Sequence, residues 1–458
     1  MTSLSLYHQA LTNMLQRMPA TSSSSFLSAL DFQRDPTLAD QFLHPLLTVL
    51  DYYTRTRLDC PRISDREFVR LGVLRVLAQG ISGRDFLQQQ QELFETQLKR
   101  SSFFAVLHSK RRRDLLGECS LQLFLRGSRQ LQSQDLLARF ACLRGRSIWA
   151  VDGHQIAHAC HALKDKKGSH VAPKSLYLLC LHTGLLHNLS PVQGDGLYRH
   201  EMPVFRENLP RWLEKAPSGS KDQSRFPILV ADAAYVDKQF WTRMLLLTRK
   251  RAVVITRTKE NMKPERYSRF GWDARDPVNL GVQGDCRVGF DGAVCMRMVD
   301  YVDPETRSAY QFLTTDQSLP PGMIAWLYLM RWRIEKVFDT GKNKLQENKA
   351  WATGEVAQEI QGHFFALTHN LLVLFRNYLH SQHGMEELKL IQKREAWLKE
   401  RERIAREKGG QVHPLHYKTP PVIQLSAQFI RALRNQIIRQ TSLADALGRF
   451  DAILRAYL

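Results

Sequence analysis

The stretch IAWLYLMRWRIEKVFDTGKNKL, Ile324–Leu345, predicts the helix around which the rest of the chain is organised. Pro320 and Pro321 precede it, as prolines often precede a first helical turn. The run itself contains no proline, and Gly341 is its only glycine. We therefore expect a single continuous helix here.

Four polar residues share one stripe of this predicted helix. Taking about 100° per residue and Tyr328 as zero, Arg331 falls at about −60° and Glu335 at about −20°. Lys342 falls at about −40° on the same scale. A carboxylate flanked by a cation and a phenol on a rigid element suits phosphodiester chemistry with metal ions.

Two aspartates follow short apolar strands elsewhere in the chain. The strand Ser147–Val151, SIWAV, is followed by Asp152, and the strand Phe226–Ala231, FPILVA, is followed by Asp232. Acidic residues at strand ends could converge with Glu335 on Mg²⁺ or Mn²⁺, which prefer oxygen ligands. Each aspartate alone would more simply be a turn or helix-capping residue. Asp237 is a weaker rival to Asp232 because it does not end the strand.

The middle of the chain mixes strands with helices, which predicts an α/β sheet with a site at one edge. Leu176–His182 and Leu185–Pro191 read as a hairpin turning at Thr183 and Gly184. Residues 257–317 change character. They contain a strong hairpin signal at Asp291-Gly292, which predicts a small β insertion between Asp232 and the Ile324–Leu345 helix.

The N-terminal third reads as helical. Glu67–Gln79 is apolar at helical spacing, residues 80–83 break the pattern, and a second helix follows from Arg84. Ser82 and Asp85 resemble a capping box at its start. Helix, tight turn and helix is a DNA-binding geometry, but it is also a common way to pack two helices.

Basic residues gather at two places that could meet nucleic acid. A predicted helix, Ser102–Leu116, carries four adjacent cations that either follow a phosphate backbone or form a solvated helix end: Lys110, Arg111, Arg112 and Arg113. The loop before the predicted hairpin carries four lysines that suit the same partner or are simply solvated: Lys164, Lys166, Lys167 and Lys174.

The overall charge points to a polyanionic partner. The chain has 65 Lys and Arg against 45 Asp and Glu, a net charge of +20, so nucleic acid is favoured over a membrane surface. No apolar run is long enough for a membrane span, and the N-terminus does not resemble a signal peptide. We expect a soluble cytosolic or nucleoid-associated protein.

Cysteine and histidine usage gives only a weak metal signal. The seven cysteines are scattered, with no CxxC pair, so neither a disulfide framework nor a cysteine-rich zinc finger is favoured. His154, His158 and His161 with Cys160 have spacings compatible with zinc but lack a second ligand cluster. A place for His154 beside the acidic site is the better interpretation.

The spacing Tyr328-x2-Arg331-x3-Glu335-x6-Lys342 matches the Y-R-E-K signature of DDE transposases of the insertion-sequence-four type, which the chain resembles from about residue 146 to 370. VDGH around Asp152 and VADAAY around Asp232 look like the first and second acidic motifs of that family. Asp339 departs from the pattern, because family members often carry a basic residue four positions after the glutamate.

The resemblance implies a cut-and-paste transposase with a ribonuclease-H-like core. Asp152, Asp232 and Glu335 would hold two Mg²⁺ or Mn²⁺ ions, and Tyr328, Arg331 and Lys342 would contact the phosphates of the transposon end. It also implies double-stranded DNA as partner, a homodimer on DNA and a hairpin on the cleaved end.

The predicted organisation has five segments. They are a helical DNA-binding region (1–145), a first core part (146–256), the β insertion (257–317), a second core part (318–380) and a helical C-terminal region suited to dimerisation (381–458). Two alternatives stay open at this point. One is a ribonuclease-H-like nuclease that cuts but does not join strands, and the other is a non-catalytic DNA-binding protein derived from such an enzyme.

Overall fold

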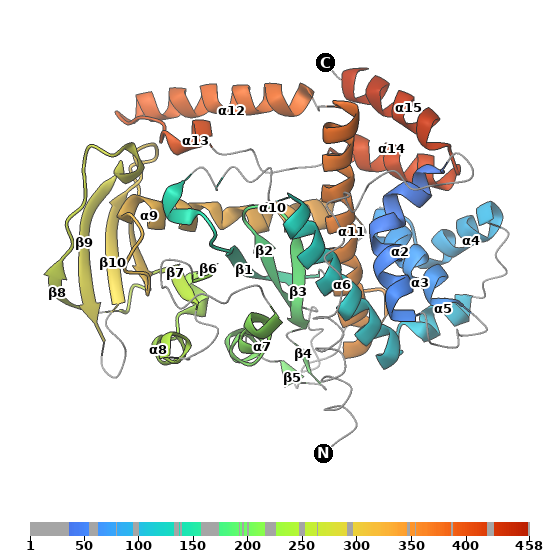
Figure 1. Ribbon diagram of the computed structural model, residues 1–458, viewed down its shortest axis with the longest axis horizontal. Coiled ribbons are helices and arrows are strands. Elements are labelled where there is room, and N and C mark those ends of the chain that lie inside the picture. The colour runs from blue at the N-terminus through green and yellow to red at the C-terminus, as the bar shows by residue number, and fades with distance from the viewer. Residues whose placement is uncertain are drawn as a thin grey trace.

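The computed structural model has a mixed α/β region at one end and a group of helices at the other (Figure 1). The structure describes these residues: 36–54, 63–78, 80–94, 100–131, 137, 140–156, 174–191, 193–194, 197–198, 201–215, 226–246, 252–262, 264–290, 296–345, 349–352, 354–385, 388–418 and 426–456. The lysines at 164, 166 and 167, the histidines at 158 and 161, Cys160 and the turn Asp291-Gly292 lie outside them.

One nine-stranded sheet forms the centre of the molecule, in the order β3-β2-β1-β6-β7-β11-β10-β9-β8. β1 runs antiparallel to β2 and parallel to β6, and β6 runs parallel to β7. The strands are β1 (Ile148–Gln155), β2 (Lys174–Cys180), β3 (Leu186–Pro191), β6 (Ile228–Ala231), β7 (Val253–Arg257), β8 (Glu265–Arg269), β9 (Val282–Gly289), β10 (Met296–Val302) and β11 (Ala309–Thr314). A separate pair joins β4 (Gln193–Gly194) to β5 (Leu197–Tyr198).

Most predicted strands form close to their predicted positions, because each apolar run pairs within the sheet and is buried there. The hairpin of β2 and β3 is confirmed. The end of the first strand was predicted wrongly: β1 continues through Asp152 to Gln155, because its backbone keeps pairing with β2. The strands within 257–317 do not form a separate sheet. They extend the same sheet beyond β7.

The predicted single helix at 324–345 is instead two: α9 (Pro321–Met330) and α10 (Trp332–Lys344). The break lies at Arg331, where the backbone remains helical but its N–H bonds to the Tyr328 carbonyl, three residues back, at 3.1 Å. Most of α9 is buried, as expected of a helix that is apolar on all sides. α10 is amphipathic and packs against β1.

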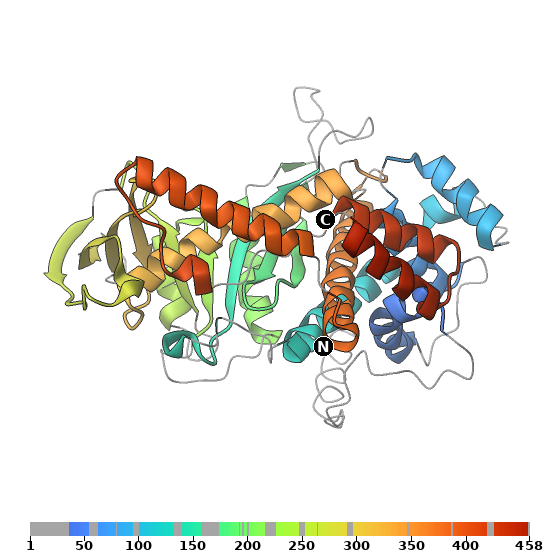
Figure 2. The same cartoon turned by 90° about the horizontal axis from the view of Figure 1, so that it is seen from above.

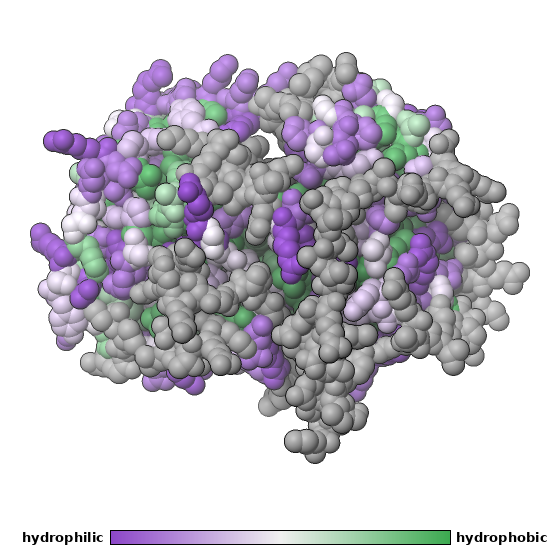
Figure 3. Space-filling model, in the orientation of Figure 1, coloured by the Kyte–Doolittle hydropathy of each residue, from purple (hydrophilic) through white to green (hydrophobic). Residues whose placement is uncertain are grey.

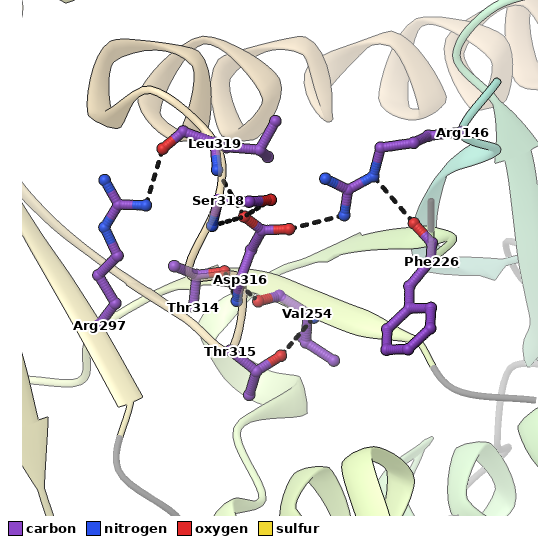
Figure 4. A network of polar contacts seen from close by, with 9 residues as sticks. All are labelled: Arg146, Phe226, Val254, Arg297, Thr314, Thr315, Asp316, Ser318 and Leu319. Atoms are coloured by element: carbon purple, nitrogen blue, oxygen red, sulfur yellow. Dashed lines mark hydrogen bonds and ion pairs between the residues drawn. The ribbon is translucent and has the colours of Figure 1, made fainter. Parts of the chain in front are cut away.

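A buried polar network fixes the segment that leads into α9 (Figure 4). Asp316 accepts hydrogen bonds from the Ser318 and Leu319 backbone N–H groups at 2.8 and 2.7 Å. Its other oxygen accepts from the guanidinium of Arg146, just before β1, at 2.6 Å. Arg297 on β10 donates to the Leu319 carbonyl at 2.7 Å. The start of α9 is thereby tied to both parts of the sheet.

The long helix α11 (Glu355–His383) separates the sheet from the helices at one end of the molecule (Figure 1). It packs against β3 on one side and against α2, α3 and α6 on the other. These N-terminal helices are α2 (Leu38–Thr54), α3 (Asp65–Leu77), α4 (Gly83–Phe94), α5 (Arg100–Val106) and α6 (Lys110–Leu131). Ser82 caps α4 as predicted: the Asp85 N–H donates to the Ser82 hydroxyl at 3.1 Å, and that hydroxyl donates to the Asp85 carboxylate at 2.6 Å.

The predicted helix Ser102–Leu116 is wrong in its bounds. α5 ends at Val106, and α6 begins at Lys110, so the basic run opens a new helix. The remaining helices are α7 (Glu201–Lys215), α8 (Lys238–Leu246), α12 (Leu388–Glu407), α13 (Leu415–Lys418), α14 (Ala427–Ile438) and α15 (Leu443–Ala456), with 3₁₀ turns at Ala141–Leu143, Ala233–Tyr235 and Pro277–Asn279.

The two ends of the described chain form one helical group. α14 packs on α2 and α3, and α15 packs on α2. The Leu443 N–H donates to the Pro36 carbonyl at 2.8 Å. α12 crosses the molecule from the outer strands toward α15, as Figures 1 and 2 show.

The visible surface is largely polar where described residues form it. Hydrophilic residues gather over α12 and over the outer strand β8 (Figure 3), and every residue of β8 is exposed. Among the described helices, none combines the length and apolar character that a membrane span requires.

Candidate active site

Asp152 and Asp232 lie side by side on neighbouring strands. β1 and β6 are parallel, and their register pairs Val151 with Ala231; the next residue is Asp152 on β1, and Asp232 directly after the end of β6. Adjacent strands lie about 4.8 Å apart, which brings the two carboxylates to the same point of the sheet. Sequence reasoning predicted this convergence from two short apolar runs.

The break between α9 and α10 connects these strands to Glu335. The guanidinium of Arg331 donates to Asp152 at 3.0 Å and to Glu335, one turn along α10, at 2.8 Å. The Tyr328 hydroxyl donates to Asp232 at 3.2 Å. All three predicted acids are therefore linked to the helix break through two polar side chains.

The surroundings of Asp152 disfavour its charged form. Burial raises the pKa of Asp152, and the nearby Glu335 and Asp232 carboxylates raise it further, against the opposing effect of Arg331. Burial and the charge of Asp232 likewise raise the pKa of Tyr328 to about 12. Carboxylates that repel one another in a partly buried place are stabilised by added positive charge.

The chemistry of the three carboxylates suits a hard divalent cation, but their positions in this structure do not yet form a metal site. Three carboxylates supply oxygen ligands of the kind that Mg²⁺ and Mn²⁺ prefer. Within the described ranges, no three His, Cys, Asp or Glu side chains stand close enough together to hold a metal ion. The Arg331 guanidinium lies between Asp152 and Glu335 and supplies positive charge there.

Comparison with protein families decides the class of this core. Residues 144–371, which contain the three acids, Tyr328, Arg331 and Lys342, match the family described as the transposase DDE domain. This segment is similar to transposase DDE domains and is called the DDE domain from here on. The N-terminal helices up to residue 143 and the helices after α11 lie outside the match.

Other comparisons add little to the transposase assignment. No curated protein sequence matches the chain. Among solved structures, the chain is similar to the piggyBac transposase in a cryo-EM structure of its synaptic complex with hairpin DNA. The identity is 12% and the TM-score 0.40, over 86% of this chain and 81% of that one.

The outer part of the DDE-domain helix α10 is open to solvent. Lys342 is exposed, as a phosphate contact requires. Asp339 is also exposed and accepts a hydrogen bond from Asn343 at 2.6 Å. Within the described contacts, Asp339 therefore serves its own helix and does not join Asp152, Asp232 or Glu335.

The basic run outside the DDE domain is only partly on the surface. Arg112 is buried, lies over the Phe68 ring and pairs with Asp65 at 3.1 Å, so it cannot follow a phosphate backbone as predicted. Arg113 pairs with Asp114 at 2.7 Å. Lys110 and Arg111 are exposed, although Arg111 also contacts Asp65.

His154 packs within the DDE domain and has no metal-ligating partner among the described residues. It is buried, and its ring stacks on those of Phe338 and Phe365 at centroid distances of 4.6 and 5.5 Å. Burial lowers the pKa of His154 to about 3, so the ring is neutral. The proposed zinc partners at 158, 160 and 161 lie outside the described residues.

Sequence reasoning missed two polar residues beside the acids. Glu201, at the start of α7, forms an ion pair with Lys174 and accepts a hydrogen bond from the Tyr235 hydroxyl. The two missed residues are Glu201 and Tyr235. In the sequence, only the place of Tyr235 within the motif VADAAY pointed to the site. By contrast, Asp237 pairs with Arg206 and accepts from the Phe240 N–H at 3.0 Å, so it caps α8.

Proposed function

We propose that this protein is a DNA transposase of the insertion-sequence-four type, which excises an element by cutting at its terminal inverted repeats and transfers the free ends to target DNA. The observation that carries the proposal is the linkage of Asp152, Asp232 and Glu335 through Arg331 and Tyr328 at one point of the DDE domain. The strand order β3-β2-β1-β6-β7 supports a ribonuclease-H-like core.

The three carboxylates are the proposed ligands of two Mg²⁺ or Mn²⁺ ions. When bound, such ions activate a water or a 3′-hydroxyl and stabilise the leaving oxygen. Burial of Asp152 near two further acids supports this role, because it leaves unbalanced negative charge that cations would offset. Asp152 lies on a strand and Glu335 on a helix, elements that hold ligands more accurately than loops do, and Asp232 directly follows a strand.

The remaining residues of the Y-R-E-K stripe would hold the scissile end. Arg331 already donates two hydrogen bonds to carboxylates, and its planar fork matches phosphate oxygens as well. Lys342 presents an exposed ammonium on the same helix. We propose that Arg331 exchanges a carboxylate for a phosphate when the DNA end enters.

Recognition of the transposon end would use charge outside the DDE domain as well. The chain carries a net charge of +20, and Lys110 and Arg111 are exposed at the start of α6. We propose double-stranded DNA as the partner and a homodimer as the form that holds two ends. Non-specific phosphate contacts of this kind weaken steeply with salt.

Cleavage of the element's own ends tests the proposal. The substrate is a labelled DNA fragment carrying the inverted repeats that flank the gene, incubated with Mg²⁺. We expect Asp152→Ala, Asp232→Ala and Glu335→Ala each to abolish strand cleavage while leaving binding to the end largely intact. Asp237→Asn is the matched control, because this acid caps α8 close to Asp232 and should keep full activity.

The products separate the proposed function from its nearest alternatives. Joining of the freed 3′-end to a plasmid supports a transposase, whereas cleavage without joining would identify a nuclease. Full cleavage by any of the three alanine variants would remove that residue from the site. Binding without cleavage by the wild type would identify a non-catalytic DNA-binding protein.

A further inference from the structure

A chain of three polar side chains lies beside the acidic site without belonging to the Y-R-E-K stripe. Lys174 forms an ion pair with one oxygen of Glu201, and the Tyr235 hydroxyl donates a hydrogen bond to the other. Both carboxylate oxygens of Glu201 are therefore occupied by groups from two different segments. We refer to these three residues as the brace.

The brace connects the two strands that carry aspartates. Tyr235 closes the 3₁₀ turn immediately after Asp232, and its N–H donates to the Asp232 carbonyl at 3.0 Å. Lys174 begins β2, where it pairs with Gln155 of β1. Glu201 begins α7, so one carboxylate joins the turn behind Asp232 to the strand pair that carries Asp152.

The residue after Asp152 leaves room for the brace. A β-carbon at Gly153 would stand 2.5 Å from the Lys174 Cε and 2.9 Å from the Glu201 carboxyl carbon, closer than real contacts allow. Glycine in the VDGH motif thus lets the Lys174–Glu201 pair approach the β1 backbone directly beside Asp152.

The brace is rigid at its aromatic end and electrostatically coupled to the acids. Tyr235 is buried, and its ring packs on that of Phe205 with centroids 5.3 Å apart. Burial raises the pKa of Tyr235, and the charges of Asp152 and Asp232 raise it further. The hydroxyl therefore keeps its proton and serves as a donor.

We propose that Glu201 is a positioning residue, which sets the separation of Asp152 and Asp232 by holding Tyr235 and Lys174 at the same time. The inference rests on the proposed function, because it assumes that the two aspartates act together on divalent cations. Residues that do not bind the metal but orient its ligands affect metal affinity strongly. Their mutation typically lowers it by about 10- to 100-fold.

The test is a titration of the full-length protein with Mn²⁺, in which bound and free ion are separated by electron paramagnetic resonance. Tyr235→Phe removes one hydroxyl and keeps the ring on Phe205. We expect Mn²⁺ affinity to fall about tenfold, with affinity for the DNA end unchanged. Glu201→Gln is the second variant: it keeps an acceptor for Tyr235 but loses the ion pair, and its affinity should also fall.

The control is Arg206→Gln, which breaks another ion pair between α7 and the segment after β6, the one with Asp237. It should leave Mn²⁺ affinity at the wild-type value. Wild-type affinity in either Tyr235→Phe or Glu201→Gln overturns the proposal, and so does an equal loss in Arg206→Gln. A wild type that binds no Mn²⁺ would instead refute the metal site of the proposed function.

Discussion

Two arginine–carboxylate contacts lie near the two ends of α9. They have the same chemistry but different surroundings. Before α9, Arg146 and Asp316 are both 0% exposed, and Asp316 accepts from two further backbone N–H groups. After α9, Arg331 is 6% exposed, but its partners Asp152 and Glu335 are 22% and 35% exposed. The first contact is sealed, whereas the carboxylates of the second face solvent.

The exposure of the carboxylate separates a contact that supports the fold from one that can take part in chemistry. When both groups are buried and the carboxylate oxygens already accept hydrogen bonds, an exchange of partners leaves an uncompensated charge inside the protein. A pair whose carboxylates reach solvent can exchange at small cost, because water or a ligand replaces the arginine. Burial of the acid, more than the presence of an arginine, distinguishes a structural contact from a candidate site.

The largest effect should come from breaking the sealed contact. Arg146→Met leaves the Asp316 carboxylate buried without its counter-charge, so we expect the free energy of unfolding to fall by about 3–5 kcal/mol. Urea unfolding followed by circular dichroism measures this loss. A loss below about 1 kcal/mol would mean that Asp316 is stabilised by its backbone N–H donors alone.

Breaking the contact of Arg331 with Asp152 and Glu335 should reduce activity much more than stability. Arg331→Met should lower the free energy of unfolding by only about 1 kcal/mol, because Asp152 and Glu335 keep part of their hydration. Cleavage of the DNA end should fall by about a hundredfold or more, since a donor to a reacting phosphate is lost. Unchanged cleavage together with a large stability loss would make Arg331 a structural residue like Arg146.

The sequence singled out the residues of the open contact but neither residue of the sealed one. Asp232 and the stripe from Tyr328 to Glu335 follow from local patterns, an apolar run ending in an acid and helical spacing. The break at Arg331 has no such pattern, and the side chain at the break contacts Asp152, 179 residues away. The pairing of Arg146 with Asp316 spans 170 residues and is likewise invisible to periodicity.

The extent of the sheet was equally hard to predict. An apolar run shows where a strand lies but not which neighbour keeps it paired. The continuation of β1 past Asp152 depends on β2, and the strands after residue 257 join the sheet through β11 and β7. The contacts of Glu201 could not be predicted for the same reason, because only the fold brings Lys174 and Tyr235 to Glu201.

A third arginine–carboxylate contact, between α6 and α11, tests the role of distance. Arg113 lies 3.6 Å from Glu359 but only 2.7 Å from Asp114, so Glu359 is poorly compensated. Burial raises the pKa of Glu359 to about 7, and nearby Glu355 and Asp114 add to the increase. The pKa of neighbouring His363 is lowered to about 4 by burial, so it adds no charge.

The raised pKa of Glu359 predicts how stability depends on pH. A carboxyl whose pKa is higher in the folded state binds its proton more tightly there, so this contribution is complete below about pH 4 and is lost as pH rises through 7. Glu359→Gln should therefore raise the free energy of unfolding by about 1–2 kcal/mol at pH 8 and change it little at pH 5. Urea unfolding of both proteins at the two pH values measures the difference. An equal change at both would show that the charge of Glu359 is not involved.

The smallest effect on stability should come from breaking an arginine–carboxylate contact that is exposed to solvent. On α12, Arg403 contacts Glu400 at 2.6 Å and also pairs with Glu407, with all three side chains more than half exposed. Water compensates each group when the other is removed, and holding long side chains in place costs entropy. Arg403→Ala should leave the melting temperature unchanged, whereas Arg146→Met should lower it clearly. A marked loss in Arg403→Ala would contradict the view that burial of the acid decides what an arginine contributes.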